Sequence, residues 1–125
     1  MTPSGSASSR EWFGDADMHM VYQWHHDSFV TFPPGAELIA SSAACPHQAF
    51  VIGPHLGMQF HIEINAEKIA KWMETPGASF PLLVENHPDS VQSYAAMMAS
   101  SDKHLGSSYA LAQRIYQTWR GRFRK

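Results

Sequence analysis

A histidine and a glutamate stand two residues apart in a stretch, Leu56 to Ile64, that alternates between apolar and polar side chains. Alternate residues of a strand point to opposite faces, so Gln59, His61 and Glu63 would share the polar face. The two ionisable residues would then lie roughly 6.5–7 Å apart along the strand. A carboxylate at that spacing can orient an imidazole and stabilise its charged form, as acid–base catalysis requires. The alternative is a strand whose polar face simply meets solvent.

Other reactive residue types form weaker patterns. Cys45 is the single cysteine, and the sequence Ser-Ala-Ala-Cys-Pro-His around it lacks the glycines that permit a nucleophile elbow. We therefore predict a small, partly buried residue on a turn between strands, not a nucleophile. The eight histidines follow no zinc-ligand spacing. The sequence therefore predicts no metal site and no cofactor.

Length, charge and cysteine content limit the classes of protein to consider. A chain of 125 residues fits one domain. A formal net charge of −2 gives no reason to propose nucleic acid or an anionic membrane as a partner. A single cysteine permits no intrachain disulfide, which favours a cytoplasmic setting. No apolar run reaches the length of a transmembrane helix.

The pattern of turn residues and apolar spacing predicts strands followed by helices. Residues 1–10 are rich in Ser, Gly and Pro and are interpreted as a flexible lead-in, and a short turn or loop follows over 11–20. Four short strands separated by turns predict an antiparallel or mixed sheet, with strands over residues 21–24, 38–41, 48–52 and 56–64.

Three helices are expected after these strands. Asn65 is suited to cap the first helix, which Pro76-Gly77 would end. A second helix is expected behind Asp89, and a third from about residues 105–108. The third helix carries an apolar stripe that we interpret as a packing face, made of Leu105, Tyr109, Ala112, Tyr116, Trp119 and Phe123.

Several stretches resemble, in the same order, the C-terminal half of a class I glutamine amidotransferase domain of the GMP synthase-like branch. They are Trp12-Phe13-Gly14, Tyr22 to Phe29, Pro33 to Ala36, Leu38 to Ser42, Cys45 to Phe50 and Gly57 to Glu63. The resemblance implies the C-terminal portion of a flavodoxin-like α/β domain, with a mixed sheet flanked by helices. A partial amidotransferase domain would then occupy residues 11–125, rich in strands over 21–64 and helical over 65–125.

The resemblance also implies roles for four residues. His61 and Glu63 would complete a Cys-His-Glu triad that hydrolyses the side-chain amide of the substrate glutamine. By position, His26 and Asp27 would contact the α-carboxylate and amino groups of that substrate, or else form a polar strand end that fixes a loop. The chain departs from many relatives, which have Gly at the position of His26 and Pro at the position of Ile62.

The nucleophile elbow Gly-x-Cys-x-Gly of the family does not occur in this sequence. Two hypotheses follow. In the first, the chain is the acid–base half of an amidotransferase, which needs an upstream half and passes ammonia to a synthase partner or acts on another γ-glutamyl bond. In the second, it is an inactive truncated fragment that acts as a binding or structural module. Under both, the isolated chain is predicted to be inactive, and exposed sheet edge and apolar surface predict self-association.

Overall fold

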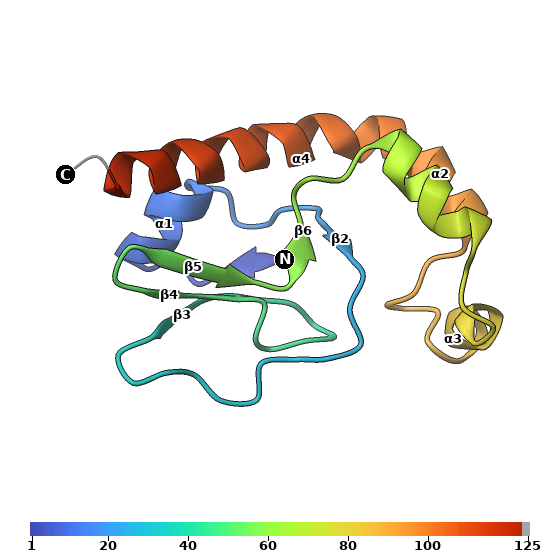
Figure 1. Cartoon of the computed structure of the whole chain (residues 1–125), viewed down its shortest axis with the longest axis horizontal. Helices are drawn as coiled ribbons and strands as arrows, with labels where there is room; N and C mark the ends of the chain where they lie inside the picture. Colours follow the sequence, from blue (N-terminus) through green and yellow to red (C-terminus); the bar gives the residue numbers. More distant parts are fainter. Residues whose placement is uncertain (124–125) are drawn as a thin grey trace. The chain divides into compact units, whose positions relative to one another are not determined.

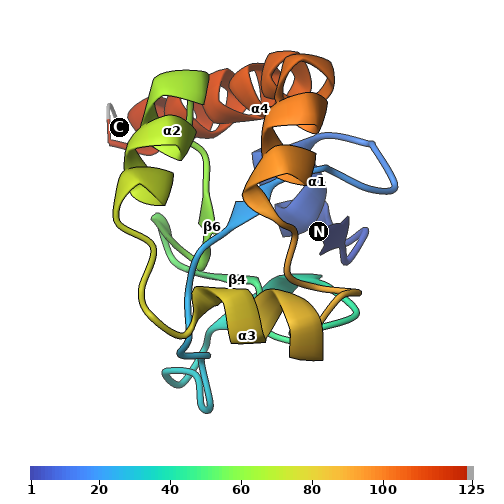
Figure 2. The ribbon, with the colours of Figure 1, turned by 90° about the vertical axis from the view of Figure 1, so that its right-hand side faces the viewer.

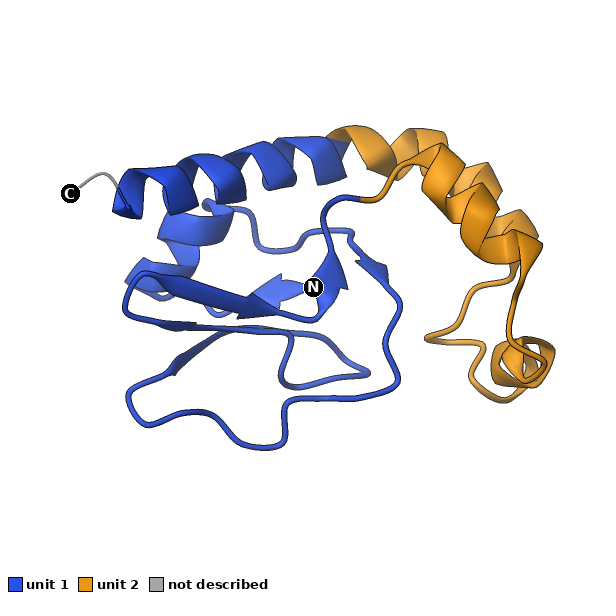
Figure 3. Ribbon diagram, viewed as in Figure 1, with its two compact units in different colours: residues 1–63, 107–125 blue, residues 64–106 orange. Residues whose placement is uncertain are grey.

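A computed structural model describes residues 1–123 of the chain, and residues 124 and 125 of the predicted domain lie outside the described residues (Figure 1). The chain divides into two compact units (Figure 3). Unit 1 combines Met1–Glu63 with Ser107–Lys125, and unit 2 is Ile64–Gly106. The residues of the His61–Glu63 motif and of the 22–29 stretch therefore belong to unit 1.

The strands of unit 1 form two sheets. The larger has the order β1-β3-β4-β5, with bounds Thr2–Pro3, Glu37–Ser41, Ala49–Ile52 and His55–Met58. The smaller pairs β2 (Tyr22–Gln23) with β6 (Phe60–His61). Every strand pair within residues 1–123 is antiparallel, which is the first of the two alternatives that the turn pattern left open. The mixed sheet that the resemblance implied is therefore corrected for these residues. The connections from β3 through β5 are too short to allow parallel neighbours, which need a crossover of a dozen or more residues.

The first ten residues are ordered into secondary structure, which corrects the prediction of a flexible lead-in. Thr2 pairs with Ser41 and Pro3 with Ala40, so β1 adds an edge strand to β3. Helix α1 runs from Ala7–Phe13, where we expected a turn or loop from residue 11. Its start is set by Ser6, whose side chain accepts a hydrogen bond from the Ser9 backbone N–H at 3.1 Å.

The predicted strand over 56–64 is interrupted at Gln59. β5 ends at Met58 in the larger sheet, and β6 begins at Phe60 in the smaller one. The predicted alternation nevertheless holds across the break, because Phe60 and Ile62 are buried whereas Glu63 is exposed. The chain thus changes sheets one residue before the segment that carries His61.

A glycine in this segment makes room for an aromatic cluster. Gly57 lies opposite Phe50 in the β4–β5 pair, and a Cβ atom at Gly57 would come 2.5 Å from Phe50 Cε1. Since no side chain fits in that space, glycine lets the Phe50 ring lie across β5. The Phe50 ring contacts those of Phe29 and Phe32 edge-on, with centroids 5.1 and 5.2 Å apart. The loop after β2 is thereby packed onto the sheet.

The core of unit 1 is built from the sheet, α1 and the end of the long helix α4 (Tyr94–Arg122). Figure 1 shows α1 and the C-terminal turns of α4 on the same side of the larger sheet. Twelve buried residues form the core: Met1, Trp12, Phe13, Ile39, Ala40, Ala49, Val51, Phe60, Ile62, Leu111, Ala112 and Ile115. The rings of Phe13 and Phe60 meet edge-on at 6.0 Å, which anchors β6 next to His61.

Unit 2 contains α2 (Ala66–Glu74), α3 (Phe80–Asn86) and the first half of α4. The predicted cap is confirmed: Asn65 Oδ1 accepts the Lys68 backbone N–H at 2.7 Å. The two separate helices expected behind Asp89 and near residue 105 are in fact one helix, which begins at Tyr94 and continues through Gly106. Helix α4 is long enough for a membrane span, yet neither it nor any other helix within residues 1–123 is apolar enough to cross one.

The apolar stripe on α4 is only partly a packing face. Leu105 and Ala112 are buried as predicted, but the aromatic side chains of the stripe are about half exposed: Tyr109, Tyr116, Trp119 and Phe123. The buried face instead includes Ser108, which is fully buried, together with Leu111 and Ile115. Apolar spacing could not indicate Ser108, because this residue is polar.

Burial at the start of unit 1 predicts a pH dependence of stability. Burial lowers the pKa of His19, assisted by the nearby N-terminal ammonium and Arg114, against a hydrogen bond to the Phe13 backbone that raises it. Because the folded state holds His19 neutral, its contribution to stability is present above its ordinary pKa of 6.5 and is lost as the pH falls below it. We expect His19→Gln to flatten the fall in unfolding free energy between pH 7.5 and 5.5, measured by urea denaturation. An equally steep fall in the variant would contradict this.

Candidate active site

His61 and Glu63 lie in direct contact, as their spacing predicted. His61 Nδ1 and Glu63 Oε1 are 2.8 Å apart, a short hydrogen bond or ion pair. Their side chains are 27% and 43% exposed, so the pair is partly shielded yet accessible. A carboxylate on Nδ1 holds a proton there and leaves Nε2 as the ring atom that can exchange protons with a substrate.

The neighbouring strand fixes the backbone of His61. In the β2–β6 pair, Tyr22 lies opposite His61 and Gln23 opposite Phe60. Figure 2 shows the green strand β6 beside the blue segment that contains β2. The Tyr22 hydroxyl is buried and has no hydrogen-bond partner among the described residues. Burial, and to a smaller extent Tyr109, raises the pKa of Tyr22, so its phenol stays neutral at physiological pH.

His26 and Asp27 lie on the loop that follows β2, and both are exposed. Among the described residues, their side chains form no hydrogen bond or ion pair that would fix the loop. His25 fixes the loop instead. Its Nδ1 lies 2.7 Å from the Asp27 carbonyl oxygen and its Nε2 lies 2.9 Å from Gln23 Oε1. The structure thus brings His61 and Glu63 together, and it places His26 and Asp27 on a loop that extends from the strand paired with His61.

The surroundings of Cys45 indicate a structural role for this residue. Its side chain is 8% exposed, on the connection between β3 and β4, as the sequence suggested. The Cys45 backbone is closed into a turn by Ser42, whose Oγ accepts the Cys45 N–H at 3.1 Å. The Sγ atom lies 3.3 Å from Ser28 Oγ and 3.5 Å from Gln59 Nε2. Sequence reasoning missed the roles of Ser28 and Gln59, because these contacts join residues far apart in the chain.

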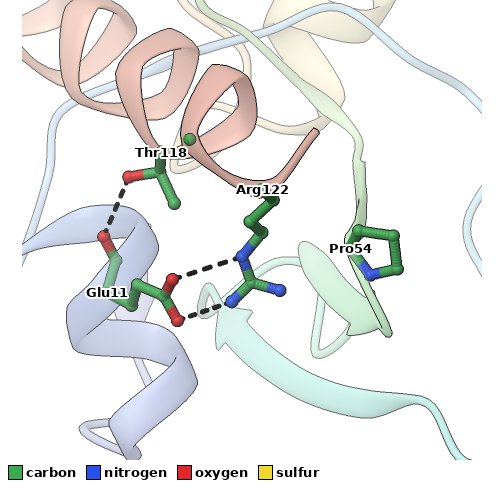
Figure 4. Close-up of a pocket in the computed structure, with 5 residues that line it drawn as sticks. Glu11, Pro54, Thr118 and Arg122 are labelled. Carbon is green, nitrogen blue, oxygen red and sulfur yellow. Dashed lines mark hydrogen bonds and ion pairs between the residues drawn. The ribbon is translucent and has the colours of Figure 1, made fainter. Parts of the chain in front are cut away.

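A pocket elsewhere in unit 1 is lined by Glu11, Pro54, Thr118, Gly121 and Arg122 (Figure 4). Its polar groups already pair with one another. The Arg122 guanidinium donates to both Glu11 carboxylate oxygens, at 3.2 and 2.5 Å, and to the Gly53 carbonyl oxygen at 2.7 Å. These contacts fasten the end of α4 to α1 and to the β4–β5 turn, so we assign them a structural role.

Within residues 1–123, no three His, Cys, Asp or Glu side chains lie close enough to hold a metal ion.

Comparison with known proteins finds similarity in structure. No protein-family model and no curated protein matches the chain. A glutamine amidotransferase from Methylobacillus flagellatus superposes with a TM-score of 0.86 at 28% identity. A glutamine amidotransferase from Thermotoga maritima superposes with a TM-score of 0.70 at 24% identity. The chain has the fold of glutamine amidotransferases.

The similarity covers nearly all of this chain but only part of each neighbour. It includes 97% and 94% of this chain, and 49% and 46% of the two amidotransferases. The chain thus spans about half the length of the solved proteins it resembles. The α/β fold expected from the sequence agrees with the fold of these neighbours.

Proposed function

We propose that this chain carries the acid–base part of a class I glutamine amidotransferase site, with His61 as the general acid and base and Glu63 as the residue that orients it. The observation that carries the proposal is the 2.8 Å contact between His61 Nδ1 and Glu63 Oε1 in a chain with an amidotransferase fold. A surface ion pair alone would be weak support, since exposed pairs are common. The fold and the orienting geometry together favour catalysis.

The reaction assigned to this site is hydrolysis of the glutamine side-chain amide. A cysteine thiolate attacks the amide carbon, and the C–N bond breaks as His61 Nε2 gives its proton to the departing ammonia. Nε2 then takes a proton from water, which attacks the thioester and releases glutamate and the thiolate. Glu63 keeps the other ring nitrogen protonated and stabilises the imidazolium that forms.

The nucleophile of this reaction comes from another segment. Cys45 is buried and hydrogen-bonded, and the sequence holds no Gly-x-Cys-x-Gly motif. We assign the nucleophile to an N-terminal half, which the neighbours' roughly twofold greater length would accommodate. His26 and Asp27, on the loop beside the paired strand, are assigned to the backbone contacts with the α-groups of glutamine.

The exposed aromatic side chains of α4 support the need for a covering partner. Tyr109, Tyr116, Trp119 and Phe123 are each about half exposed, and the rings of the last two contact each other at 5.1 Å. Aromatic side chains are enriched at protein interfaces. We assign this face to the complementary half of the domain, or to a second copy of the chain when that half is lacking. A synthase that receives the ammonia would be a further partner.

The experiment that tests the proposal compares glutamine hydrolysis by two forms of the protein. One is the chain alone, and the other is the joined form, in which the sequence encoded upstream is attached to it. We expect glutamate and ammonia release only from the joined form. Activity of the chain alone would overturn the assignment of the nucleophile. A folded joined form without activity would favour the alternative, an inactive fragment that serves as a binding or structural module.

A further inference from the structure

The side chain of Gln59 joins three segments of unit 1. It stands at the break between β5 and β6, two residues before His61. Its Nε2 atom donates to the His47 carbonyl oxygen at 2.6 Å, and lies 3.4 Å from Ser28 Oγ and 3.5 Å from Cys45 Sγ. Its backbone N–H donates to the Gln48 carbonyl oxygen at 3.0 Å. Both ends of Gln59 are therefore attached to residues 45–48, the segment that leads into β4.

Residues 45–48 are in turn attached to the loop that carries His26 and Asp27. His47 Nδ1 lies 2.6 Å from the Phe29 carbonyl oxygen. Since a carbonyl only accepts, that nitrogen carries the proton. Ser28 Oγ lies 3.3 Å from Cys45 Sγ, and the Phe32 and His47 rings meet edge-on at 4.8 Å. Hydrogen bonds therefore run continuously from the loop, through the 45–48 segment, to the residue that precedes Phe60 and His61.

We infer that Gln59 is a positioning residue, which fixes the glutamine-contacting loop relative to the imidazole of His61. The inference rests on the proposed function, in which His26, Asp27 and His61 act on one substrate. The shortest of its contacts, to the His47 carbonyl, requires an N–H donor. An apolar side chain of the same length would fill the space without holding the loop.

The first test is Gln59→Met in the joined form, which keeps the side-chain volume and removes the donor. A shift of the substrate by about 1 Å can lower turnover by roughly 100-fold, so we expect kcat to fall about 10–100-fold while KM for glutamine stays within about threefold. Gln113→Met, at an exposed position of α4, is the matched control and is expected to retain wild-type kinetics. Wild-type kcat in Gln59→Met would overturn the inference.

A second variant separates hydrogen bonding from packing. In Gln59→Glu, the carboxylate cannot donate to the His47 carbonyl, but the protonated acid can. The two variants differ only at residue 59, so the ratio of their kcat values reports on the side chain at that position. We expect the Gln59→Glu to Gln59→Met ratio to rise as the pH falls from 8 to 5. A ratio that does not change with pH would indicate a packing role and would contradict the inference. Should Gln59→Met fail to fold, the comparison of Gln59→Glu with wild type over the same range replaces it.

NMR on the chain alone distinguishes failure of this inference from failure of the proposed function. In Gln59→Met we expect displaced amide resonances for Ser28 and Phe29 and a displaced ring resonance for His61, with no such change in Gln113→Met. If these shifts occur while the joined wild type shows no glutaminase activity, the positioning role stands and the proposed function fails. Unchanged resonances would refute the positioning role whatever the activity.

Discussion

Replacement of His61 by alanine is expected to lower glutaminase turnover of the joined form by roughly 10²–10⁴-fold, the usual contribution of a positioned general acid–base group. The reason is the loss of Nε2, which delivers the proton to departing ammonia and accepts one from water. Because His61 acts on the transition state, KM for glutamine should change little. Release of glutamate and ammonia under steady-state conditions measures both constants.

His55→Ala is the matched control for this prediction. His55 is exposed on β5, six residues before His61, and its ring meets the Phe123 ring edge-on, with centroids 6.1 Å apart. We expect it to retain wild-type kcat. If His61→Ala retained turnover within about threefold of wild type, well below the acid–base range, the His61–Glu63 contact would be a strand surface pair without a catalytic role.

Replacement of Trp12 by alanine is expected to lower the free energy of unfolding by about 3–5 kcal/mol, the cost of truncating a large buried aromatic side chain. Trp12 is fully buried in the core of unit 1, and the Arg122 guanidinium carbon lies 4.9 Å from the centre of its ring. The substitution therefore opens a cavity and removes a cation–π contact. Urea denaturation followed by circular dichroism measures the loss.

Trp119→Ala provides the comparison, since it removes the same atoms from a site that is 48% exposed. We expect it to cost less than about 1 kcal/mol, as substitutions at exposed sites usually do. Equal losses for the two variants would contradict the burial of Trp12 in the core.

Local sequence signals predicted the parts of the fold that depend on local chemistry. The sequence predicted the Asn65 cap, a turn between the strands over 48–52 and 56–64, and the contrast between buried Ile62 and exposed Glu63. Caps, turns and alternation could be predicted because they act over a few residues. The sequence did not predict the edge strand β1. Two residues, one of them proline, form a strand only because β3 provides a partner almost forty residues away.

The candidate site also combines a contact that local sequence predicted with contacts that depend on the fold. The spacing of His61 and Glu63 predicted their contact, since both lie on one strand face. The hydrogen bonds of Gln59 to residues 12 and 31 positions away follow from the meeting of β5, the 45–48 segment and the loop after β2, and no local pattern encodes that meeting. The half-exposed aromatic residues of α4 were misassigned because the buried face of the helix includes Ser108, a polar residue that apolar spacing does not indicate.

Unit 1 is discontinuous along the chain, which has a consequence for its synthesis. Leu111, Ala112 and Ile115 complete a core whose other members all lie before residue 63. A ribosome adding about 5–20 residues per second would therefore hold the strands for several seconds before the closing helix is made. During that interval β-edges and apolar side chains stay open to chaperones and to neighbouring nascent chains. Contacts of such high sequence separation also slow refolding, since the ends of a long loop must meet before any of them forms.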